Sequence, residues 1–344
     1  MDYMKAVVLE TTGLAGIRIR DVPVPTPGTG EVLGRVLACG VGGTVLRKVR
    51  SIPASALPVI LGHEAACQIV AVGKGENEIA VDDRAVLYFY ITCGNCRYCS
   101  TDRPSLCENE GRGELRVGEH IDGALAEYVC LPARNFIKIP PTLNPVDATV
   151  VIDAISTPLH VCSRAQAAAG ERMAIIGAAG GVGVHLVQVA ANLGLSVIAI
   201  DRAEKLPPLV DFTRGDLHLV PSDDANLLDQ LGGSIDIVVD FVGSADTSRI
   251  SMNLLGRGGR LVALARDATT SLLVPGIDLV SNELSVLGSK YATPAEVQSA
   301  VKMVADGSVR AVITESGGLD DVPSMLEKIE SGITVGRAVV DLQA

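Results

Sequence analysis

The chain has 344 residues, which corresponds to about two domains of ordinary size, and hydrophobic residues make up 48% of it. Only 20% of the residues are charged, so the composition excludes an intrinsically disordered chain and a coiled coil. The net charge of −11 and the aromatic content of 3% exclude the basic, stacking surfaces of nucleic-acid-binding proteins and the basic surfaces that bind anionic membranes.

The first part of the chain, residues 1–150, predicts a β domain. Short segments of strand-like composition are separated by Gly and Pro clusters, a pattern that is typical of a β-barrel. The predicted strands are residues 5–9, 31–37, 67–72, 84–90 and 125–131.

A different pattern begins near residue 150. Apolar runs alternate with segments of helical period such as residues 182–193, which predicts a parallel sheet covered by helices over residues 151–291. The apolar runs are residues 173–176, 197–200, 235–240, 261–264 and 284–287.

The last segment, residues 292–344, is expected to return to the first domain and complete it. A helix is predicted over Pro294–Ala305, and strands are predicted at residues 309–313 and 337–342.

One long stretch, residues 173–200, contains no Asp, Glu, Lys or Arg and exceeds the roughly 20 residues of a membrane-spanning helix. Several glycines divide it into a strand, a turn and a helix, so it does not predict a membrane span. The N-terminus has no signal-peptide pattern, and we therefore expect a cytoplasmic protein.

Four of the eight cysteines are closely spaced, and they predict a zinc site. Cys93, Cys96, Cys99 and Cys107 are separated by two, two and seven residues. Four thiolates suit tetrahedral zinc, and a reducing cytosol disfavours disulfides. Because protein would fill all four positions, such a zinc would be structural. Four free cysteines and an iron–sulfur cluster remain as alternatives, although the usual spacings of the latter differ.

A glycine-rich segment follows the predicted strand at residues 173–176 and opens a helix, which predicts a dinucleotide-binding turn. It departs from the strict G-x-G-x-x-G pattern because Ala178 stands where the first glycine would be. The residues expected to face the pyrophosphate are Gly177, Gly180, Gly181, Val182 and Gly183.

Asp201 ends the next predicted strand, close to the spacing expected for a carboxylate that binds the ribose hydroxyls. A carboxylate there repels a 2′-phosphate and favours NAD. Arg202 could accommodate that phosphate, so NADP remains possible.

A third motif is Gly62-His63-Glu64. Together with the β-rich first domain, the four-cysteine loop at residues 93–107 and the glycine turn, it resembles the medium-chain, zinc-containing alcohol dehydrogenases over nearly the whole chain. The resemblance implies a GroES-like β-barrel catalytic domain into which an α/β Rossmann domain is inserted. It also implies NAD(P)-dependent hydride transfer to or from an alcohol, ketone or aldehyde carbon of a small molecule, and a homodimer or homotetramer.

The resemblance also implies roles for single residues. His63, Glu64 and Asp153 match ligands of a catalytic zinc, and Thr44 matches the hydroxyl residue that relays a proton from the substrate alcohol. The cysteine loop would hold the structural zinc. Three further residues match contacts to the nicotinamide half of the cofactor, namely Thr157, Val242 and Leu264.

Two departures from the family pattern concern the catalytic zinc. Gly42 stands where members have a cysteine ligand, and Val45 stands where they have an acidic residue. Loss of such a supporting residue alone weakens metal binding about 10–100-fold. Two versions of the site stay open: a zinc held by His63, Glu64 and Asp153, or a zinc-free site in which Thr44, His63 or Asp153 donates a hydrogen bond or a proton.

The doubt about this zinc leaves two alternative functions. Zinc-free relatives reduce the polarised C=C bonds of enones, enoyl thioesters or quinones, and other members bind a dinucleotide without catalysis. The cysteine loop, together with His63, Glu64 and Asp153, favours the alcohol dehydrogenase function.

Overall fold

The structure is a computed structural model that describes residues 2–76, 78–109, 115–264 and 271–343. The chain divides into two compact units. Unit 1 contains Met1–Asp153, Thr293–Gly307 and Ile313–Ala344, and unit 2 contains Ala154–Ala292 and Ser308–Val312. The expected architecture, an α/β domain inserted into a β domain, is confirmed.

Unit 1 is built on antiparallel pairing. Within its described residues, a seven-stranded sheet has the order β10-β6-β5-β3-β18-β17, with β9 also paired to β3, and a three-stranded sheet has the order β2-β1-β4. The strands are β1 (Tyr3–Leu9), β2 (Ile17–Pro23), β3 (Glu31–Val41), β4 (Val59–Ile60), β5 (Glu64–Val72), β6 (Arg84–Leu87), β7 (Tyr90–Ile91), β8 (Leu115–Arg116), β9 (Tyr128–Pro132), β10 (Phe136–Lys138), β17 (Ile313–Gly317) and β18 (Arg337–Asp341). The helices are α1 (Gly43–Ser51), α2 (Pro145–Val150), α9 (Pro294–Ala305) and α10 (Val322–Glu330).

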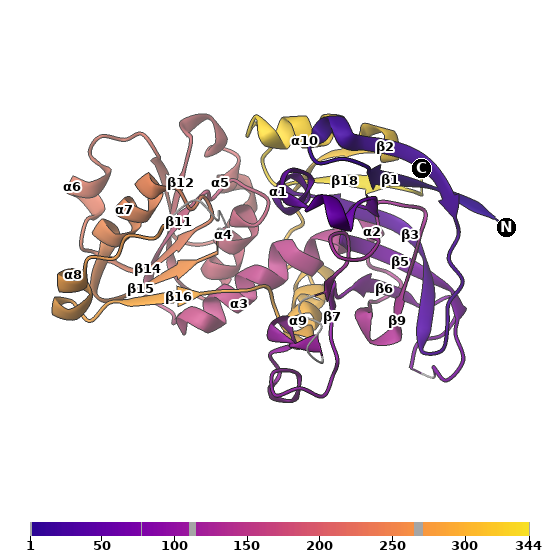
Figure 1. The fold of residues 1–344 in the computed structure, drawn as a ribbon. Coiled ribbons are helices and arrows are strands. Elements are labelled where there is room, and N and C mark those ends of the chain that lie inside the picture. Colours follow the sequence, from indigo (N-terminus) through magenta and orange to yellow (C-terminus); the bar gives the residue numbers. More distant parts are fainter. Residues whose placement is uncertain (1, 77, 110–114, 265–270, 344) are drawn as a thin grey trace. The chain divides into compact units, whose positions relative to one another are not determined.

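Strand β3 lies between β5 and β18, and this arrangement gathers residues that are distant in the sequence (Figure 1). Both neighbours run antiparallel to β3, with Gly40 opposite Glu64 of β5 and opposite Val339 of β18. The end of β3 therefore lies beside the beginnings of β5 and β18. Strand β18, near the end of the chain, thus pairs with a strand from its first part.

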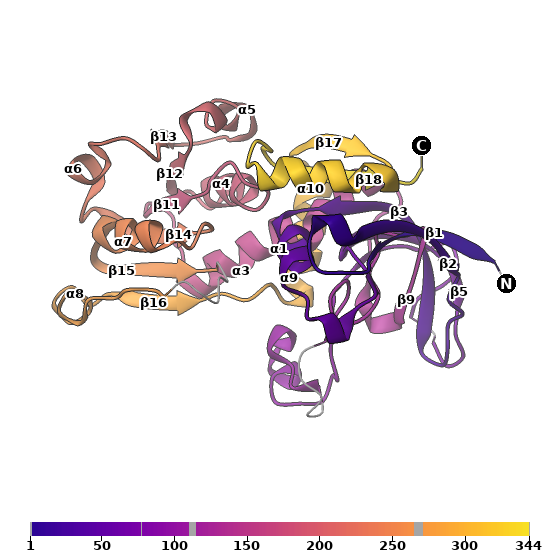
Figure 2. The ribbon, with the colours of Figure 1, turned by 45° about the horizontal axis from the view of Figure 1, so that its top comes forward.

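Unit 2 contains a parallel sheet of buried strands. In its described part the six strands have the order β13-β12-β11-β14-β15-β16, and β15 and β16 run side by side at one edge (Figure 2). The strands are β11 (Arg172–Ile176), β12 (Ser196–Asp201), β13 (Leu217–Pro221), β14 (Ile235–Asp240), β15 (Leu255–Ala263) and β16 (Ser285–Gly288). The helices are α3 (Ser156–Ala165), α4 (Gly183–Asn192), α5 (Leu209–Phe212), α6 (Leu227–Leu231), α7 (Ala245–Leu254) and α8 (Gly276–Ser281).

The chain order in this sheet reverses direction between β11 and β14. In sheets of this kind, dinucleotides bind outside the carboxyl ends of the strands at the point of reversal. The uncharged residues 173–200 form the core of this arrangement as most of β11 and β12 with α4 between them. No helix within the described residues is long and apolar enough to cross a membrane.

The predicted strand at residues 309–313 is wrong except for Ile313, which begins β17. Side chains of α4 bind the backbone of this segment instead. Gln188 exchanges hydrogen bonds with the amide and carbonyl of Arg310 at 2.8 and 3.0 Å, and the Val312 amide donates to Nε2 of His185 at 3.1 Å. The backbone groups are satisfied without a neighbouring strand, so no sheet forms there.

We expect His185→Ala to lower the free energy of unfolding by about 1–3 kcal/mol, because the buried amide of Val312 would lose its acceptor. Nδ1 of His185 also lies 2.8 Å from the carbonyl oxygen of Gly181, and the side chain is fully buried. Urea unfolding measures the change. His218→Ala is the control, because that side chain is 60% exposed, and its effect should stay within about 0.5 kcal/mol. Equal effects of the two variants would contradict the account.

Candidate functional site

The four cysteines of the loop at residues 93–107 come together in unit 1. Their sulfur atoms lie within 4.8 Å of one another. The Sγ atoms of Cys93 and Cys99 are 4.0 Å apart, those of Cys96 and Cys107 are 4.0 Å apart, and those of Cys93 and Cys107 are 3.5 Å apart. A tetrahedral zinc with Zn–S bonds of about 2.3 Å requires sulfur–sulfur separations of about 3.8 Å. The cluster therefore fits zinc.

Backbone amides around this cluster point at the sulfur atoms. The amides of Cys93 and Asn109 donate to Sγ of Cys107 at 3.2 and 3.1 Å, and the amide of Cys96 donates to Sγ of Cys93 at 3.4 Å. Such donors stabilise negative charge on sulfur, which is the form that binds a metal. By contrast, Cys39 and Cys67, which lie outside the loop, are fully buried in the core.

The glycine-rich turn of unit 2 connects β11 to α4 and adopts a conformation that side chains would obstruct. Gly177 has a φ of +82°. A Cβ atom at Gly183 would overlap the carbonyl oxygen of Gly177 and lie 2.8 Å from that of Ala178, so the helix could not begin so close to the turn. Gly180, Gly181 and Val182 complete the connection. This is the arrangement in which a backbone approaches a pyrophosphate.

Asp201 ends β12 and contacts the glycine-rich turn directly. Its carboxylate accepts hydrogen bonds from the amides of Ala179 and Arg202, both at 2.8 Å. Lys205, which the sequence did not indicate, is buried near this carboxylate. Burial lowers the pKa of Lys205, and the negative charge of Asp201 raises it in part. The Arg202 side chain is exposed, with Nε 3.5 Å from Oε1 of Glu204.

The residues predicted to contact the nicotinamide half lie on neighbouring elements of unit 2. Val242 follows β14, and its amide donates a hydrogen bond to the Asp240 carboxylate at 2.8 Å. This residue is 53% exposed. Leu264 is half-buried at the end of β15, and Thr157 is buried in the first turn of α3. The glycine turn, Asp201, Val242 and Leu264 thus lie at the carboxyl ends of four adjacent parallel strands.

The three residues matched to a catalytic zinc also come together, in unit 1. One ligand atom of each of His63, Glu64 and Asp153 lies within 4.8 Å of the others. His63 and Glu64 stand at the start of β5, and Asp153 lies in a π-helical turn over Val151–Ile155, a feature often found at functional sites. Nε2 of His63 is buried and has no hydrogen-bond partner within the described residues.

A fourth group, Arg337, lies within this cluster. It is the first residue of β18 and is only 4% exposed. Its Nη2 atom lies 2.9 Å from Oε1 of Glu64 and 3.4 Å from Oδ2 of Asp153. The guanidinium thus forms ion pairs with two of the three residues that were matched to zinc ligands.

Glycines in β3 and just after it leave room for these side chains. A Cβ atom at Gly40 would lie 2.6 Å from Oε2 of Glu64. At Gly42, a Cβ atom would overlap Nη1 of Arg337 and lie 2.7 Å from its Cζ. The guanidinium therefore occupies the space of the cysteine side chain that the family pattern has at this position.

The groups around Glu64 have opposing effects on its pKa. Burial raises the pKa of Glu64 above the usual range of a glutamate, and the Arg337 guanidinium lowers it. The neighbouring Asp153 carboxylate raises it further, and His63 lowers it. The guanidinium thus opposes the upward shift that burial and the Asp153 carboxylate impose on the pKa of Glu64.

Thr44 lies two residues beyond Gly42, in the first turn of α1. It is half-buried, and Nη2 of Arg47 donates a weak hydrogen bond to its Oγ1 at 3.5 Å. Val45, which replaces the acidic residue of the family pattern, is buried and apolar. The Arg47 guanidinium thus contacts the Thr44 hydroxyl.

Arg337 and Lys205 are the residues that sequence reasoning missed. One signal for Arg337 was available, because His63, Glu64 and Asp153 without the usual cysteine leave two carboxylates to be balanced by a cation. An arginine at the start of the strand Arg337–Asp341 satisfies that need. Its partner could not be identified before the pairing of β18 with β3 was known.

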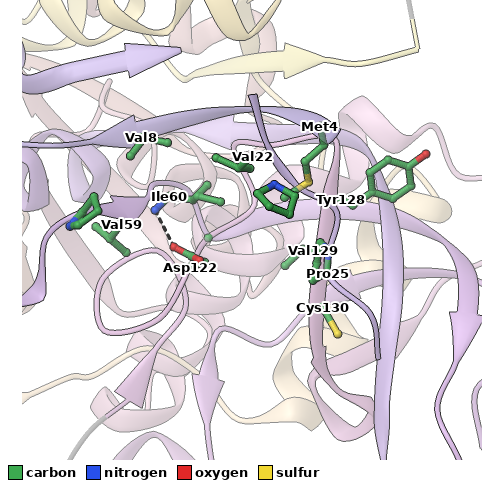
Figure 3. A pocket seen from close by; sticks show the side chains of 13 residues that line it. Met4, Val8, Val22, Pro25, Val59, Ile60, Asp122, Tyr128, Val129 and Cys130 are labelled. Carbon is green, nitrogen blue, oxygen red and sulfur yellow. Dashed lines mark hydrogen bonds between the residues drawn. The ribbon is translucent and has the colours of Figure 1, made fainter. Parts of the chain in front are cut away.

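A separate pocket of about 350 Å³ lies elsewhere in unit 1 (Figure 3). Apolar side chains such as Met4, Val22 and Ile60 line it, and the Asp122 carboxylate accepts a hydrogen bond from the Ile60 amide at 2.9 Å. None of the residues predicted for catalysis or metal binding is among those that line it.

Comparisons with known proteins agree over the whole chain. Residues 28–141 match the alcohol dehydrogenase GroES-like domain, and residues 181–306 match the zinc-binding dehydrogenase family. An alcohol dehydrogenase of Geobacillus stearothermophilus is 32% identical over 99% of both chains. An acryloyl-coenzyme A reductase of Metallosphaera sedula is 28% identical over 98% of this chain and 99% of its own. The structure of a thermostable alcohol dehydrogenase from Pyrobaculum aerophilum is 29% identical, covers 99% of this chain and 100% of its own, and superimposes with a TM-score of 0.89.

We expect Cys96→Ser to reduce the zinc content of the purified protein by about one ion per chain, because three thiolates and a hydroxyl bind zinc much more weakly than four thiolates. Elemental analysis of the desalted protein measures this. Cys130→Ser is the matched control, since Cys130 lies outside the cluster, with Sγ 3.9 Å from Glu31, and its zinc content should not change. Unchanged zinc in Cys96→Ser would show that the loop is not the zinc site.

Proposed function

The chain belongs to the zinc-containing medium-chain alcohol dehydrogenase family, and from this premise we propose the cofactor, the site and the residues of its reaction. It is an alcohol dehydrogenase-type NAD(P)-dependent oxidoreductase that acts on a small-molecule substrate. In the reducing direction, a hydride from the nicotinamide and a proton convert an aldehyde or ketone to an alcohol and NAD(P)+.

NAD(H) is the proposed cofactor. The turn from Gly177 to Gly183 would bind the pyrophosphate through backbone amides, and the Asp201 carboxylate would accept hydrogen bonds from the ribose hydroxyls. The position of Asp201 against this turn is the observation that carries the cofactor proposal, because a 2′-phosphate would meet its negative charge. Thr157, Val242 and Leu264 would contact the nicotinamide half.

The cysteine loop is the proposed site of the structural zinc. Cys93, Cys96, Cys99 and Cys107 would hold the ion through four thiolates, in line with their sulfur–sulfur distances. Four protein ligands leave no position for substrate. Such an ion supplies folding energy to the loop and takes no part in hydride transfer.

A catalytic zinc fits the cluster of His63, Glu64 and Asp153 less well than a structural zinc fits the cysteine loop. Gly42 offers no ligand, and the carboxylates of Glu64 and Asp153 are engaged by Arg337. The proton chemistry of the reaction is therefore assigned to the side chains of this site.

Thr44 is proposed to donate the proton to the oxygen of the reduced substrate. Its Oγ1 accepts from Arg47, which leaves the hydroxyl proton to point toward another acceptor. Nε2 of His63 is buried, lies 3.6 Å from Oε1 of Glu64 and makes no hydrogen bond in the described parts of the chain. We propose that it supplies a second hydrogen bond or a proton at the substrate oxygen.

Reduction of a polarised C=C bond is the second candidate function. Here the hydride adds to the β-carbon, the unsaturated carbonyl group becomes an enolate, and a proton then adds to the α-carbon. The observation that favours it is the guanidinium among the matched zinc ligands, since zinc-free members of this superfamily perform this reaction. The similarity to an acryloyl-coenzyme A reductase is consistent with it.

Two further features complete the proposal. A cytoplasmic location is proposed because thiolate zinc ligands need a reducing compartment, and none of the eight cysteines is in a disulfide. We also propose a homodimer or homotetramer. The edge strand β16 and the exposed side chains of Ile277 and Val280 on α8, which are 73% and 76% exposed, support a contact at this edge of unit 2.

We expect NADH to reduce the C=O bond in preference to the C=C bond of an α,β-unsaturated aldehyde such as cinnamaldehyde. Product identification by mass spectrometry or NMR separates the unsaturated alcohol from the saturated aldehyde. The saturated parent aldehyde serves as the control, because only a carbonyl reductase turns it over. Reduction confined to the C=C bond would overturn the first proposal in favour of the second.

We expect Asp201→Ala to raise KM for NADH about 10–100-fold, since the loss of hydrogen bonds to the ribose costs about 1–3 kcal/mol. KM for NADPH should fall or stay unchanged, because the charge that repels the 2′-phosphate is gone. The control is Asp223→Ala, an exposed carboxylate in the loop after β13. Parallel losses with both cofactors would show that Asp201 does not discriminate between them.

A further inference from the structure

We propose that the Arg337 guanidinium takes the place of the catalytic zinc, so that the cluster of His63, Glu64 and Asp153 holds a built-in cation and binds no metal. The proposal rests on the proposed function only in placing hydride transfer at this cluster. The metal content that it predicts can be measured without substrate.

Space is the first argument. In the register of β18 and β3, Ala338 lies opposite Val41, so Arg337 lies opposite Gly42. A Cβ atom at residue 42 would overlap Nη1 of Arg337. A cysteine at residue 42 would therefore require the guanidinium to move from this position, and the chain has glycine at residue 42.

The available donors are the second argument. A catalytic zinc is held by three protein ligands and one open position. Arg337 lies 2.9 Å from Glu64 and 3.4 Å from Asp153, which leaves only the ring nitrogen of His63 without a competing cation. Val45 also gives no carboxylate to support an ion, because it is buried and apolar.

Charge is the third argument. Glu64 is fully buried and Asp153 is mostly buried, and at such depth a nearby cation favours the charged form of a carboxyl group. The Arg337 guanidinium is such a cation, and it is part of the protein itself. Zinc entering the cluster would have to displace it, and Arg337 is only 4% exposed.

These observations assign Arg337 a positioning role. It fixes the orientation of the Glu64 and Asp153 carboxylates and keeps a positive charge at a site where the reaction generates an anionic oxygen. Arg337 is buried and contacts both carboxylates, so its influence on the reaction passes through them and through the local potential.

The test is the zinc content of the full chain after incubation with excess zinc and desalting. We expect about one zinc per chain in the natural protein, at the cysteine loop, and about two in Arg337→Ala, because His63, Glu64 and Asp153 are then released to bind a metal. Arg260→Ala is the matched control. Arg260 also pairs with a carboxylate, that of Glu171, but it lies in unit 2, and its loss should leave one zinc.

A second variant keeps the proposal testable if Arg337→Ala does not fold. Gly42→Cys combined with Arg337→Ala restores a thiolate donor, and zinc then supplies the cation that the carboxylates have lost. Circular dichroism identifies the folded variants. A second zinc in either folded variant supports the proposal.

Two zinc ions in the natural protein would overturn the proposal, and so would a single zinc in both folded variants. The aldehyde and cinnamaldehyde assays judge the proposed reaction separately. A protein with one zinc that reduces only C=C bonds would therefore refute the reaction and leave the role of Arg337 intact.

Discussion

The ion pairs of Arg337 with Glu64 and Asp153 are the constraint on which the rest of unit 1 depends. Removing one partner from such a buried pair costs about 3–5 kcal/mol, because the remaining charge stays buried without compensation. The three residues come from β18, β5 and the π-helical turn after α2. Their contact therefore joins the end of the chain to its first half. Glycine at residues 40 and 42 leaves room for these groups, since a Cβ atom there would force one of the charged side chains to shift.

The same constraint opposes the binding of a metal at this cluster. Unit charges 4 Å apart interact by about 4 kcal/mol at an effective dielectric constant of about 20, so a zinc dication beside the guanidinium would face a repulsion of about 8 kcal/mol. Three good ligands could offset that repulsion, but two of them are already engaged. The cysteine loop has no such competition, and its four sulfur atoms, with amides donating to Cys93 and Cys107, are arranged for zinc.

The sequence indicates most of the fold and part of the site, and the differences have physical causes. Buried parallel strands such as β11 and β14 are continuous apolar runs, so their positions are evident. Strand β13 was missed because Leu217–Pro221 lies at a sheet edge and is only partly buried. The segment around Val312 looks like a strand by composition, yet its amides bind side chains of α4, which local pattern cannot reveal.

The site shows the same division between local and long-range information. The cysteine spacing and the glycine turn are local motifs, and the sequence contains them in full. Arg337 acts across strands that are distant in the chain, so its role depends on the register of β18 with β3. Gly42 is informative from the sequence as a missing ligand, and only the structure identifies the side chain that fills its space.

Anomalous diffraction at the zinc absorption edge, on crystals of the natural protein grown with excess zinc, tests the central claim most directly. We predict a single strong peak per chain among Cys93, Cys96, Cys99 and Cys107, with the Arg337 guanidinium in contact with Glu64 and Asp153. A second peak among His63, Glu64 and Asp153, with Arg337 turned away, would contradict the account.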